Sequence, residues 1–326
     1  MFAEFFAAQG FVVLDGGLAT ELERRGADLR DPLWSARALL ENPDLIRLVH
    51  ESYFAAGADV AVSASYQASV SGFTARGTTP GEARRVITLS VELAQEARRR
   101  FWDAAGRVAS QRVRPLVVGS IGPYGAALAD GSEYRGNYAV SRQALADFHG
   151  PRLEALIGAA PDLLAIETIP SPDEALLVLE LLNAWPEIQV WVSFTCRDGS
   201  RVSEGQPVAE AIAAVAVHRQ VAAVGFNCVA PALASPLLAA AAAVTDKPLV
   251  IYPNSGERWD AGERRWVPGD GACDFGESAP GWFERGARLI GGCCRTTPET
   301  IRAIRRSLES LVRAQRASES ATARSR

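Results

Sequence analysis

Short apolar segments alternate with amphipathic segments along most of the chain. The apolar residues of these short segments are continuous, which is typical of parallel strands buried on both faces. The pattern therefore predicts eight parallel strands with helices between them. The eight segments, all rich in Val, Ile and Leu, span residues 11–17, 59–65, 114–122, 163–168, 189–196, 222–228, 248–254 and 287–294.

Three of the segments between these strands carry helix signals. Residues 80–103 open with proline and have apolar residues at helical spacing. Residues 141–158 open with a serine that can cap a helix, and we expect Pro151 to interrupt that helix. Residues 297–312 open with a Thr-Pro pair, which is favoured at a cap and first turn.

Eight strand–helix repeats in about 300 residues predict an α/β fold, a single-domain (β/α)8 TIM barrel over residues 1–313. A doubly wound open sheet is the alternative, and it would place a G-x-G-x-x-G loop after the first strand. The sequence "DGGLAT" at residues 15–20 lacks that spacing. Residues 314–326 are small and polar, so we expect them to form a mobile tail.

Two predicted connections are long. Residues 123–140 follow the third strand, and residues 255–281 follow the seventh strand. Both follow the carboxyl ends of strands, where a barrel keeps its active-site loops. Loops of this length are typically lids, binding loops or disordered segments. The sequence leaves open whether residues 255–281 act as a lid.

Composition and charge exclude several classes of protein. The 34 basic and 38 acidic residues give a net charge of −4 without a basic block, so we expect no nucleic-acid partner. The most apolar run, residues 236–244, is shorter than the ~20 residues that a membrane span needs. The first ten residues lack a basic region and include Glu4, which argues against a secretory signal. Five cysteines, an odd number, do not suggest a disulfide framework, so we expect a cytoplasmic protein.

Polar and sulfur-containing side chains gather at the carboxyl ends of the predicted strands. In a barrel of this type the active site lies at that end, so we expect it to be built from these side chains. The strand-end residues are Asp15, Gly16, Gly17, Ser63, Ser65, Ser120, Gly122, Glu167, Cys196, Asn227, Cys228, Asn254, Cys293 and Cys294.

Three of these residues, Cys228, Cys293 and Cys294, suggest a metal site. Zinc binds thiolates at about 2.3 Å in tetrahedral geometry, and a catalytic zinc keeps one position open. Consecutive side chains in a strand point to opposite faces, so adjacent cysteines share an ion only where the chain leaves β geometry. Gly291 and Gly292 are expected to give the backbone that freedom. The spacing alone also allows buried structural cysteines, because the chain has no C-x-x-C pair.

A zinc ion with three thiolate ligands has a net charge near −1 and is a poor Lewis acid for water. Coordination to a metal deprotonates a further thiol at neutral pH, although the ordinary pKa of a free thiol is about 8.5. The predicted site therefore favours alkylation of a substrate thiol over hydrolysis.

The cysteine stretches "GFNC" (225–228) and "GGCC" (291–294) resemble the signature of the zinc-dependent homocysteine S-methyltransferases. The resemblance extends from about residue 11 to residue 310. Several other stretches are similar to the branch of the family that uses S-methylmethionine or S-adenosylmethionine. These stretches are residues 14–26, 63–69, 119–138 and 252–257.

The resemblance implies a (β/α)8 barrel and a role for each matching residue. Cys228, Cys293 and Cys294 would bind Zn²⁺ and form the catalytic centre. Asp15 and Glu167 match the acidic residues that hold the amino group of homocysteine, and charge-assisted hydrogen bonds from one ammonium to two carboxylates would fix its orientation. Without the resemblance, Asp15 could equally be a turn residue and Glu167 a helix cap.

Three more strand-end residues are predicted to contact substrate, namely Ser63, Tyr66 and Asn227. The ring of Tyr66 could also face the cationic donor, as could the rings of Tyr124 and Trp259.

The predicted methyl donor is a sulfonium. Gln67 stands where the betaine-using branch has a tyrosine, which disfavours betaine. The resemblance therefore implies one direct transfer from S-methylmethionine, or from S-adenosylmethionine, to the zinc-bound thiolate of homocysteine, forming methionine. A betaine- or corrinoid-dependent methyltransferase and a non-catalytic thiol- or metal-binding barrel remain the alternatives. The sequence leaves open whether methionine biosynthesis or sulfonium salvage is the main role, and whether selenohomocysteine is accepted.

The chain ends soon after the eighth predicted helix. It lacks a long C-terminal extension like the one that assembles tetramers in the betaine-using enzymes. We therefore expect a monomer or a weak dimer.

Overall fold

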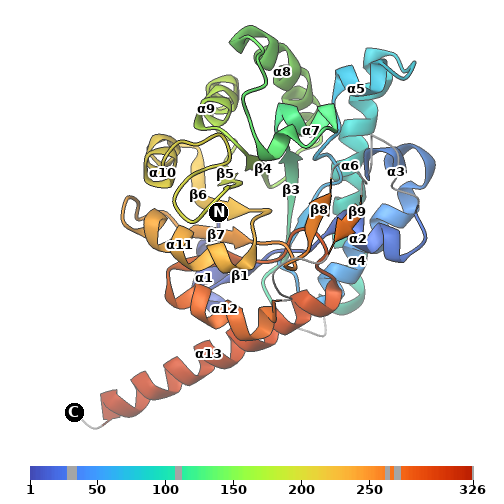
Figure 1. Cartoon of the computed structure of the whole chain (residues 1–326). Coiled ribbons are helices and arrows are strands. Elements are labelled where there is room, and N and C mark those ends of the chain that lie inside the picture. Colours follow the sequence, from blue (N-terminus) through green and yellow to red (C-terminus); the bar gives the residue numbers. More distant parts are fainter. Residues whose placement is uncertain (28–34, 107–111, 261–264, 268–272, 325–326) are drawn as a thin grey trace.

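The computed structural model describes residues 1–27, 35–106, 112–260, 265–267 and 273–324. Its central element is an eight-stranded parallel sheet that curls into a barrel, with helices packed around it (Figure 1). The order of strands around the sheet is β1-β10-β7-β6-β5-β4-β3-β2. These strands are β1 (Val12–Val13), β2 (Val60–Val62), β3 (Leu116–Ile121), β4 (Leu163–Ile169), β5 (Val190–Phe194), β6 (Val221–Asn227), β7 (Leu249–Tyr252) and β10 (Ala287–Ile290). The predicted single-domain (β/α)8 barrel is confirmed.

The α-helices follow the strands in the expected alternation. They are α1 (Ala3–Gln9), α2 (Leu18–Arg24), α3 (Ser35–Glu41), α4 (Pro43–Ala56), α5 (Val70–Thr74), α6 (Pro80–Phe101), α7 (Tyr124–Leu128), α8 (Arg142–Gly158), α9 (Pro172–Leu181), α10 (Val208–Ala216), α11 (Ala234–Ala242), α12 (Phe275–Glu284) and α13 (Pro298–Arg324). Short segments of other helical types are η1 (Trp102–Gly106), η2 (Ser132–Tyr134), η3 (Leu182–Ala184) and η4 (Pro231–Leu233). Among the described helices, none combines the length and the apolar character needed to cross a membrane.

The apolar residues form two separate cores because each strand is buried on both faces. The larger core lies between the strands and the surrounding helices. The smaller core fills the interior of the barrel and includes Val60, Val118 and Trp191. Phe2 and Phe5 belong to this inner core, so α1 covers the end of the barrel opposite the strand ends that carry the cysteines.

The barrel closes at the seam between β1 and β2, where single hydrogen bonds replace a strand ladder. The backbone N–H of Val13 donates to Asp59 Oδ2 at 2.9 Å, and the N–H of Asp59 donates to the Val13 carbonyl at 2.7 Å. At the other end of the seam, the N–H of Val62 donates to Asp15 Oδ2 at 2.8 Å. Two carboxylates therefore complete the barrel.

Two of the predicted helices are confirmed with one correction. Helix α6 begins at Pro80 with Thr79 as its cap, and α8 begins after the cap Ser141. We expected Pro151 to interrupt α8, but the helix continues through it. Proline at this position leaves the carbonyl of Asp147 without its helical donor, and Asp147 is exposed, so water can satisfy that carbonyl.

Helix α13 begins at Pro298, as predicted, and continues to Arg324. The predicted boundary at residue 313 therefore lies within a helix, which extends away from the barrel (Figure 1). The side chains from Arg313 to Ser318 are exposed. The mobility of residues 314–326 stays a prediction.

Both long connections contain secondary structure. The connection after β3 contains α7 and η2, which pack against each other and bring η2 against β4. The connection after β7 contains an antiparallel hairpin of β8 (Arg258–Asp260) and β9 (Arg265–Val267). The role of residues 255–281 as a lid stays a prediction.

Candidate active site

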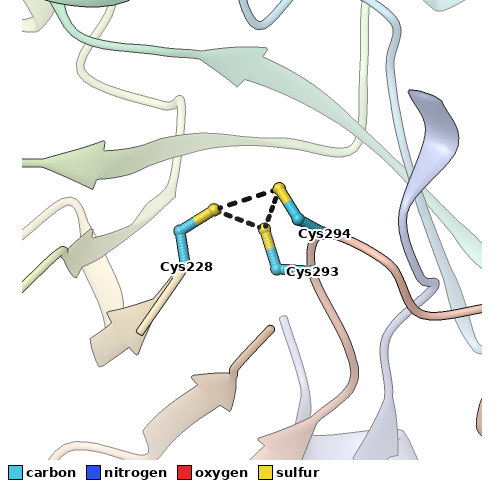
Figure 2. Close-up of side chains that lie close together, drawn as sticks. All are labelled: Cys228, Cys293 and Cys294. Carbon is cyan, nitrogen blue, oxygen red and sulfur yellow. Dashed lines mark hydrogen bonds between the residues drawn. The ribbon is translucent and has the colours of Figure 1, made fainter. Parts of the chain in front are cut away.

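The three predicted metal ligands lie together at the carboxyl end of the barrel (Figure 2). The Sγ atom of Cys228 is 2.8 Å from that of Cys293 and 3.6 Å from that of Cys294. The Sγ atoms of Cys293 and Cys294 are 3.9 Å apart. All three thiols are free, and they are the only cluster of possible metal-binding groups that the described residues form.

Cys228 is placed by an uncommon backbone conformation. It follows β6 directly and has φ of +52°, in the left-handed region that non-glycine residues seldom adopt. Its N–H donates to the carbonyl of Tyr252, which ends the neighbouring strand β7. The backbone turns away from the strand direction at this point and carries the thiol toward Cys293 and Cys294.

Cys293 and Cys294 lie in the turn after β10, and hydrogen bonds hold both of them. The N–H of Cys293 donates to the Pro253 carbonyl at 2.8 Å, and the N–H of Cys294 donates to Asn254 Oδ1 at 3.2 Å. The hydroxyl of Thr296 donates to the Cys293 carbonyl at 2.6 Å. Because the strand ends at Ile290, both side chains can point toward Cys228, as expected.

We expected Gly291 and Gly292 to give the turn a backbone conformation that other residues avoid. This expectation is wrong, because neither glycine has a positive φ. The turn needs them for space instead. A Cβ atom on Gly291 would lie 2.6 Å from the Cβ of Leu14, and a Cβ on Gly292 would lie 2.4 Å from Thr296 Oγ1. The residue with left-handed backbone is Arg295, with φ of +64°.

The three sulfur atoms suit a thiophilic metal ion. Two thiolates on one tetrahedral zinc lie about 3.8 Å apart, close to two of the three distances observed. The Sγ atoms of Cys228 and Cys293, 2.8 Å apart, lie closer together than that spacing. Hydrogen bonds from Cys293 and Cys294 lower the pKa of the Cys228 thiol, so Cys228 is the first of the three to ionise.

A buried carboxylate, Glu167, lies at the end of β4 near the cysteines. It accepts hydrogen bonds from the hydroxyl of Ser120 and, at 2.9 Å, from the hydroxyl of Tyr252. Burial raises the pKa of Glu167 to about 7, and the nearby Cys228 contributes to that rise. No lysine or arginine pairs with Glu167 among the described ion pairs, so its charge is free to bind a cation.

Asp15 is the second predicted carboxylate of the site. Burial raises its pKa well above the ordinary range, and the charge of Glu167 raises it further. The charge of Glu167 therefore reaches Asp15, and their joint binding of an ammonium stays a prediction. One oxygen of Asp15 also accepts the N–H of Val62 at the seam of the barrel, a role that the sequence did not reveal.

The predicted residues Ser63 and Asn227 are both engaged in contacts within the protein. The hydroxyl of Ser63 accepts the N–H of Ser120 at 3.0 Å. The amide of Asn227 accepts the N–H of Thr168 at 2.7 Å and donates to the hydroxyl of the same residue at 2.7 Å. These contacts position the ends of β3 and β4, and contact of Ser63 or Asn227 with substrate stays a prediction.

Tyr66 lies close to the cysteine cluster. Burial raises the pKa of its phenol, and the charge of Cys228 raises that pKa further. The ring packs against Gly122, where a Cβ atom would lie 2.6 Å from the ring. The ring of Tyr124 contacts Tyr138 and Phe148 instead, at centroid distances of 5.4 and 5.1 Å.

The side chain of Trp259 lies outside the part of the chain that the structure describes. Its predicted contact with the donor therefore stays a prediction.

Sequence reasoning gave no role to three residues that shape the site. The hydroxyl of Tyr134, on η2, donates to Cys228 Sγ at 3.6 Å. Thr168 has φ of +59°, in the left-handed region. The hydroxyl of Tyr252 is hydrogen-bonded both to Glu167 and to the Ser193 hydroxyl of β5. The stretches containing Tyr134 and Tyr252 carried a family signal, but Thr168 lies in an apolar strand, and only tertiary contacts reveal its role.

Comparison with known proteins identifies close relatives. The sequence profile described as "Homocysteine S-methyltransferase" matches residues 12–308. A Bacillus subtilis homocysteine S-methyltransferase is 51% identical over 293 residues, covering 90% of this chain and 93% of that protein. An Escherichia coli homocysteine S-methyltransferase is 47% identical over 298 residues, covering 91% and 95%.

Solved structures agree with these sequence matches. The metallated form of the Escherichia coli homocysteine methyltransferase MmuM superimposes with a TM-score of 0.84 at 44% sequence identity. The match covers 94% of this chain and 99% of that one.

Proposed function

The chain belongs to the homocysteine S-methyltransferase family, and we propose that it transfers a methyl group from a sulfonium donor to the thiol of homocysteine, forming methionine. The observation that carries the proposal is the placement of three convergent thiols beside two buried carboxylates that no cation among the described residues neutralises. Thiols and carboxylates match two functional groups of homocysteine, its thiol and its ammonium. The (β/α)8 barrel presents them at its usual catalytic end.

Asp15 and Glu167 bind the substrate ammonium in this proposal. Both carboxylates are buried, and the charge of Glu167 raises the cost of charging Asp15, so a cation between them is favoured. Hydrogen bonds from Ser120 and Tyr252 hold Glu167 in one orientation. A fixed ammonium places the substrate side chain in a single direction, toward the cysteines.

Cys228, Cys293 and Cys294 are the proposed ligands of a zinc ion. When bound there, zinc would supply a low pKa for the substrate thiol, so that the thiol reacts as a thiolate at neutral pH. The Escherichia coli relative whose metallated form is solved supports a metal at this site. The three thiol ligands favour zinc over a hard cation such as Mg²⁺.

The proposed donor is S-methylmethionine, with S-adenosylmethionine as a second donor. The sulfonium methyl group is attacked in line by the homocysteine sulfur, and holding both reactants in place makes the step effectively unimolecular. Gln67 disfavours betaine. It is buried, and its amide donates to the carbonyl of Ala126 at 3.2 Å, so it provides no cation for a carboxylate.

An assay of homocysteine with each donor tests this proposal. We expect methionine from S-methylmethionine, loss of the activity with a chelator, and recovery on adding Zn²⁺. The absence of transfer from both sulfonium donors would refute the proposed reaction. Methyl transfer by a folded, metal-free protein would refute the role of zinc. Transfer from betaine or from a methylated corrinoid would support the alternatives.

We further propose that the protein acts as a cytoplasmic monomer or weak dimer. The free cysteines support the cytoplasmic location. Sedimentation equilibrium across a range of protein concentrations would measure the oligomeric state directly.

A further inference from the structure

A third buried carboxylate, Glu133, lies at the same end of the barrel and has no assigned role. It belongs to η2, and only 9% of its surface is exposed. Its Oε2 atom is buried without a hydrogen-bond partner among the described residues. Burying a charged group without a partner is costly, so a protein seldom keeps one unless a ligand supplies the partner.

The position of η2 brings Glu133 to the reaction site. The segment packs against the end of β4, which carries Glu167. The next residue, Tyr134, donates its hydroxyl to Cys228 Sγ at 3.6 Å. The charge of Glu133 raises the pKa values of Cys294 and Tyr66, in keeping with this position of η2.

Within the described part of the chain, no basic side chain forms an ion pair with this carboxylate. Arg135, which follows η2 in the chain, is largely exposed, and its guanidinium lies 3.9 Å from the carboxylate of Asp130. Burial raises the pKa of Glu133 to about 7, with Cys228 and Asp130 adding to the rise and Arg135 opposing it only weakly. Glu133 therefore combines a free carboxylate oxygen with two nearby aromatic rings, Tyr66 and Tyr134.

A carboxylate beside aromatic faces is the chemistry that recognises a soft organic cation. We propose that Glu133 binds the positively charged sulfur of the methyl donor at this site. This inference rests on the proposed function, because it assumes that the donor approaches the cysteines with its sulfonium end. Glu133 is distinct from the Asp15–Glu167 pair, which is proposed to bind the ammonium of homocysteine.

The proposal predicts which kinetic constant Glu133 controls. During transfer, the homocysteine sulfur donates an electron pair to the methyl carbon, and the bond between that carbon and the donor sulfur breaks. The bonding pair stays on the donor sulfur, which becomes a neutral thioether. The attraction to Glu133 is therefore strongest before transfer and weakens as the positive charge disappears, so it acts on binding of the donor more than on kcat.

Glu133→Gln tests this assignment, because it keeps the shape of the side chain and removes its charge. We expect KM for S-methylmethionine to rise about tenfold, while KM for homocysteine and kcat change less than about threefold. Asp130→Asn is the matched control. It removes an exposed carboxylate from the same loop and keeps the oxygen that accepts the N–H of Ser132, so it should leave all three constants unchanged.

A binding measurement with tetramethylammonium separates the charge from the rest of the donor. This ion has a comparable charge but no amino-acid group. We expect its Kd, measured by calorimetry on the zinc-loaded protein, to rise about tenfold in Glu133→Gln and to stay unchanged in Asp130→Asn. The midpoint of thermal unfolding should stay equal or rise in Glu133→Gln, because the variant loses an unpaired buried charge.

Three results would overturn the assignment. The first is an equal Kd for tetramethylammonium in the wild type and in Glu133→Gln. The second is an equal loss of affinity for homocysteine and for the donor in this variant. The third is a lower unfolding midpoint of the variant together with loss of binding of both substrates. Failure of the proposed function gives a different result, since wild-type protein would then transfer no methyl group from either sulfonium. The tetramethylammonium measurement does not depend on turnover, so it tests Glu133 in that case too.

Discussion

At the scale of single residues, left-handed backbone places the key side chains. Cys228, Thr168 and Arg295 each have φ between +52° and +64°, and each follows or ends a strand at the active-site end. Such conformations cost on the order of 1–3 kcal/mol for a non-glycine residue and persist where surrounding contacts enforce them. Hydrogen bonds from Asn227 to Thr168 and from Cys228 to Tyr252 supply that enforcement.

Replacing Cys228 with serine should remove the metal without unfolding the barrel. A serine hydroxyl is a poor ligand for zinc, so we expect the zinc content to fall from about one per chain to below about 0.2, with activity lost in parallel. Elemental analysis and the thiolate charge-transfer absorption of the cobalt-substituted protein would measure this. Cys273→Ser is the control, because Cys273 contacts Ser278 rather than the cluster. Full zinc content in Cys228→Ser would contradict the proposed site.

Glu167 should give homocysteine binding a dependence on pH. Because burial raises its pKa to about 7, Glu167 is ionised at pH 8 and mostly protonated at pH 6. The neutral acid attracts an ammonium less, so we expect KM for homocysteine to rise about tenfold from pH 8 to pH 6 through this group. Ionisation of the substrate thiol also affects KM, and Glu167→Gln separates the two effects.

In Glu167→Gln, KM for homocysteine should be higher at every pH, and the part of its pH dependence due to Glu167 should be absent. Steady-state kinetics at fixed, saturating donor would measure both. An identical pH profile in the variant and the wild type would show that Glu167 does not bind the ammonium.

At the scale of elements, helix α8 supports two of the active-site loops through one buried arginine. Arg152 is 1% exposed. Its guanidinium donates to the carbonyls of Gly122 at 2.9 Å, Ser65 at 3.3 Å and Tyr66 at 3.0 Å. The ends of β2 and β3 are thereby held together from outside the barrel.

Arg152→Met should destabilise the fold, because three buried carbonyls lose a charged donor. We expect the free energy of unfolding to fall by about 3 kcal/mol, measured by urea denaturation. Arg142→Met is the matched control on the same helix. Arg142 is exposed and paired with Glu180, so its loss should change stability by less than about 0.5 kcal/mol. Equal effects of the two substitutions would contradict the supporting role of Arg152.

At the scale of the whole molecule, closure of the barrel depends on buried charge. Asp59 lies at the seam between β1 and β2, accepts the N–H of Val13, and forms ion pairs with Arg305 and Arg112. Arg305 belongs to the last helix, α13, so this cluster connects the first strands to the end of the chain. It lies at the end of the barrel opposite the cysteines.

Asp59→Asn should lower stability and leave catalysis unchanged. Removing one partner of a buried ion pair leaves the arginines uncompensated, so we expect a loss of about 3 kcal/mol in the free energy of unfolding. KM and kcat, measured where the variant is fully folded, should stay within about twofold of wild type. Asp44→Asn is the control, because the side chain of Asp44 is 80% exposed. A selective loss of activity in Asp59→Asn would contradict a purely structural role.

The sequence alone determined the barrel and predicted the position of its active site. Continuous apolar runs need burial on both faces, and eight of them with helices between leave few other arrangements. The strand-end positions of Asp15, Glu167, Cys228 and the adjacent pair Cys293–Cys294 followed from the same pattern. Chemistry at strand ends is readable because all parallel strands of a barrel end on one face.

Only the tertiary structure decided how these groups are held and which other residues join them. Three features depend on neighbours that are distant in the sequence. They are the close packing at Gly291 and Gly292, the burial of Glu133, and the hydrogen bond of Asp15 at the seam. Pro151 lies within α8 because its surroundings tolerate a missing hydrogen bond. Periodicity in a sequence reports which face of an element is buried, whereas burial of an individual charge and its lack of a partner arise only when the elements pack together.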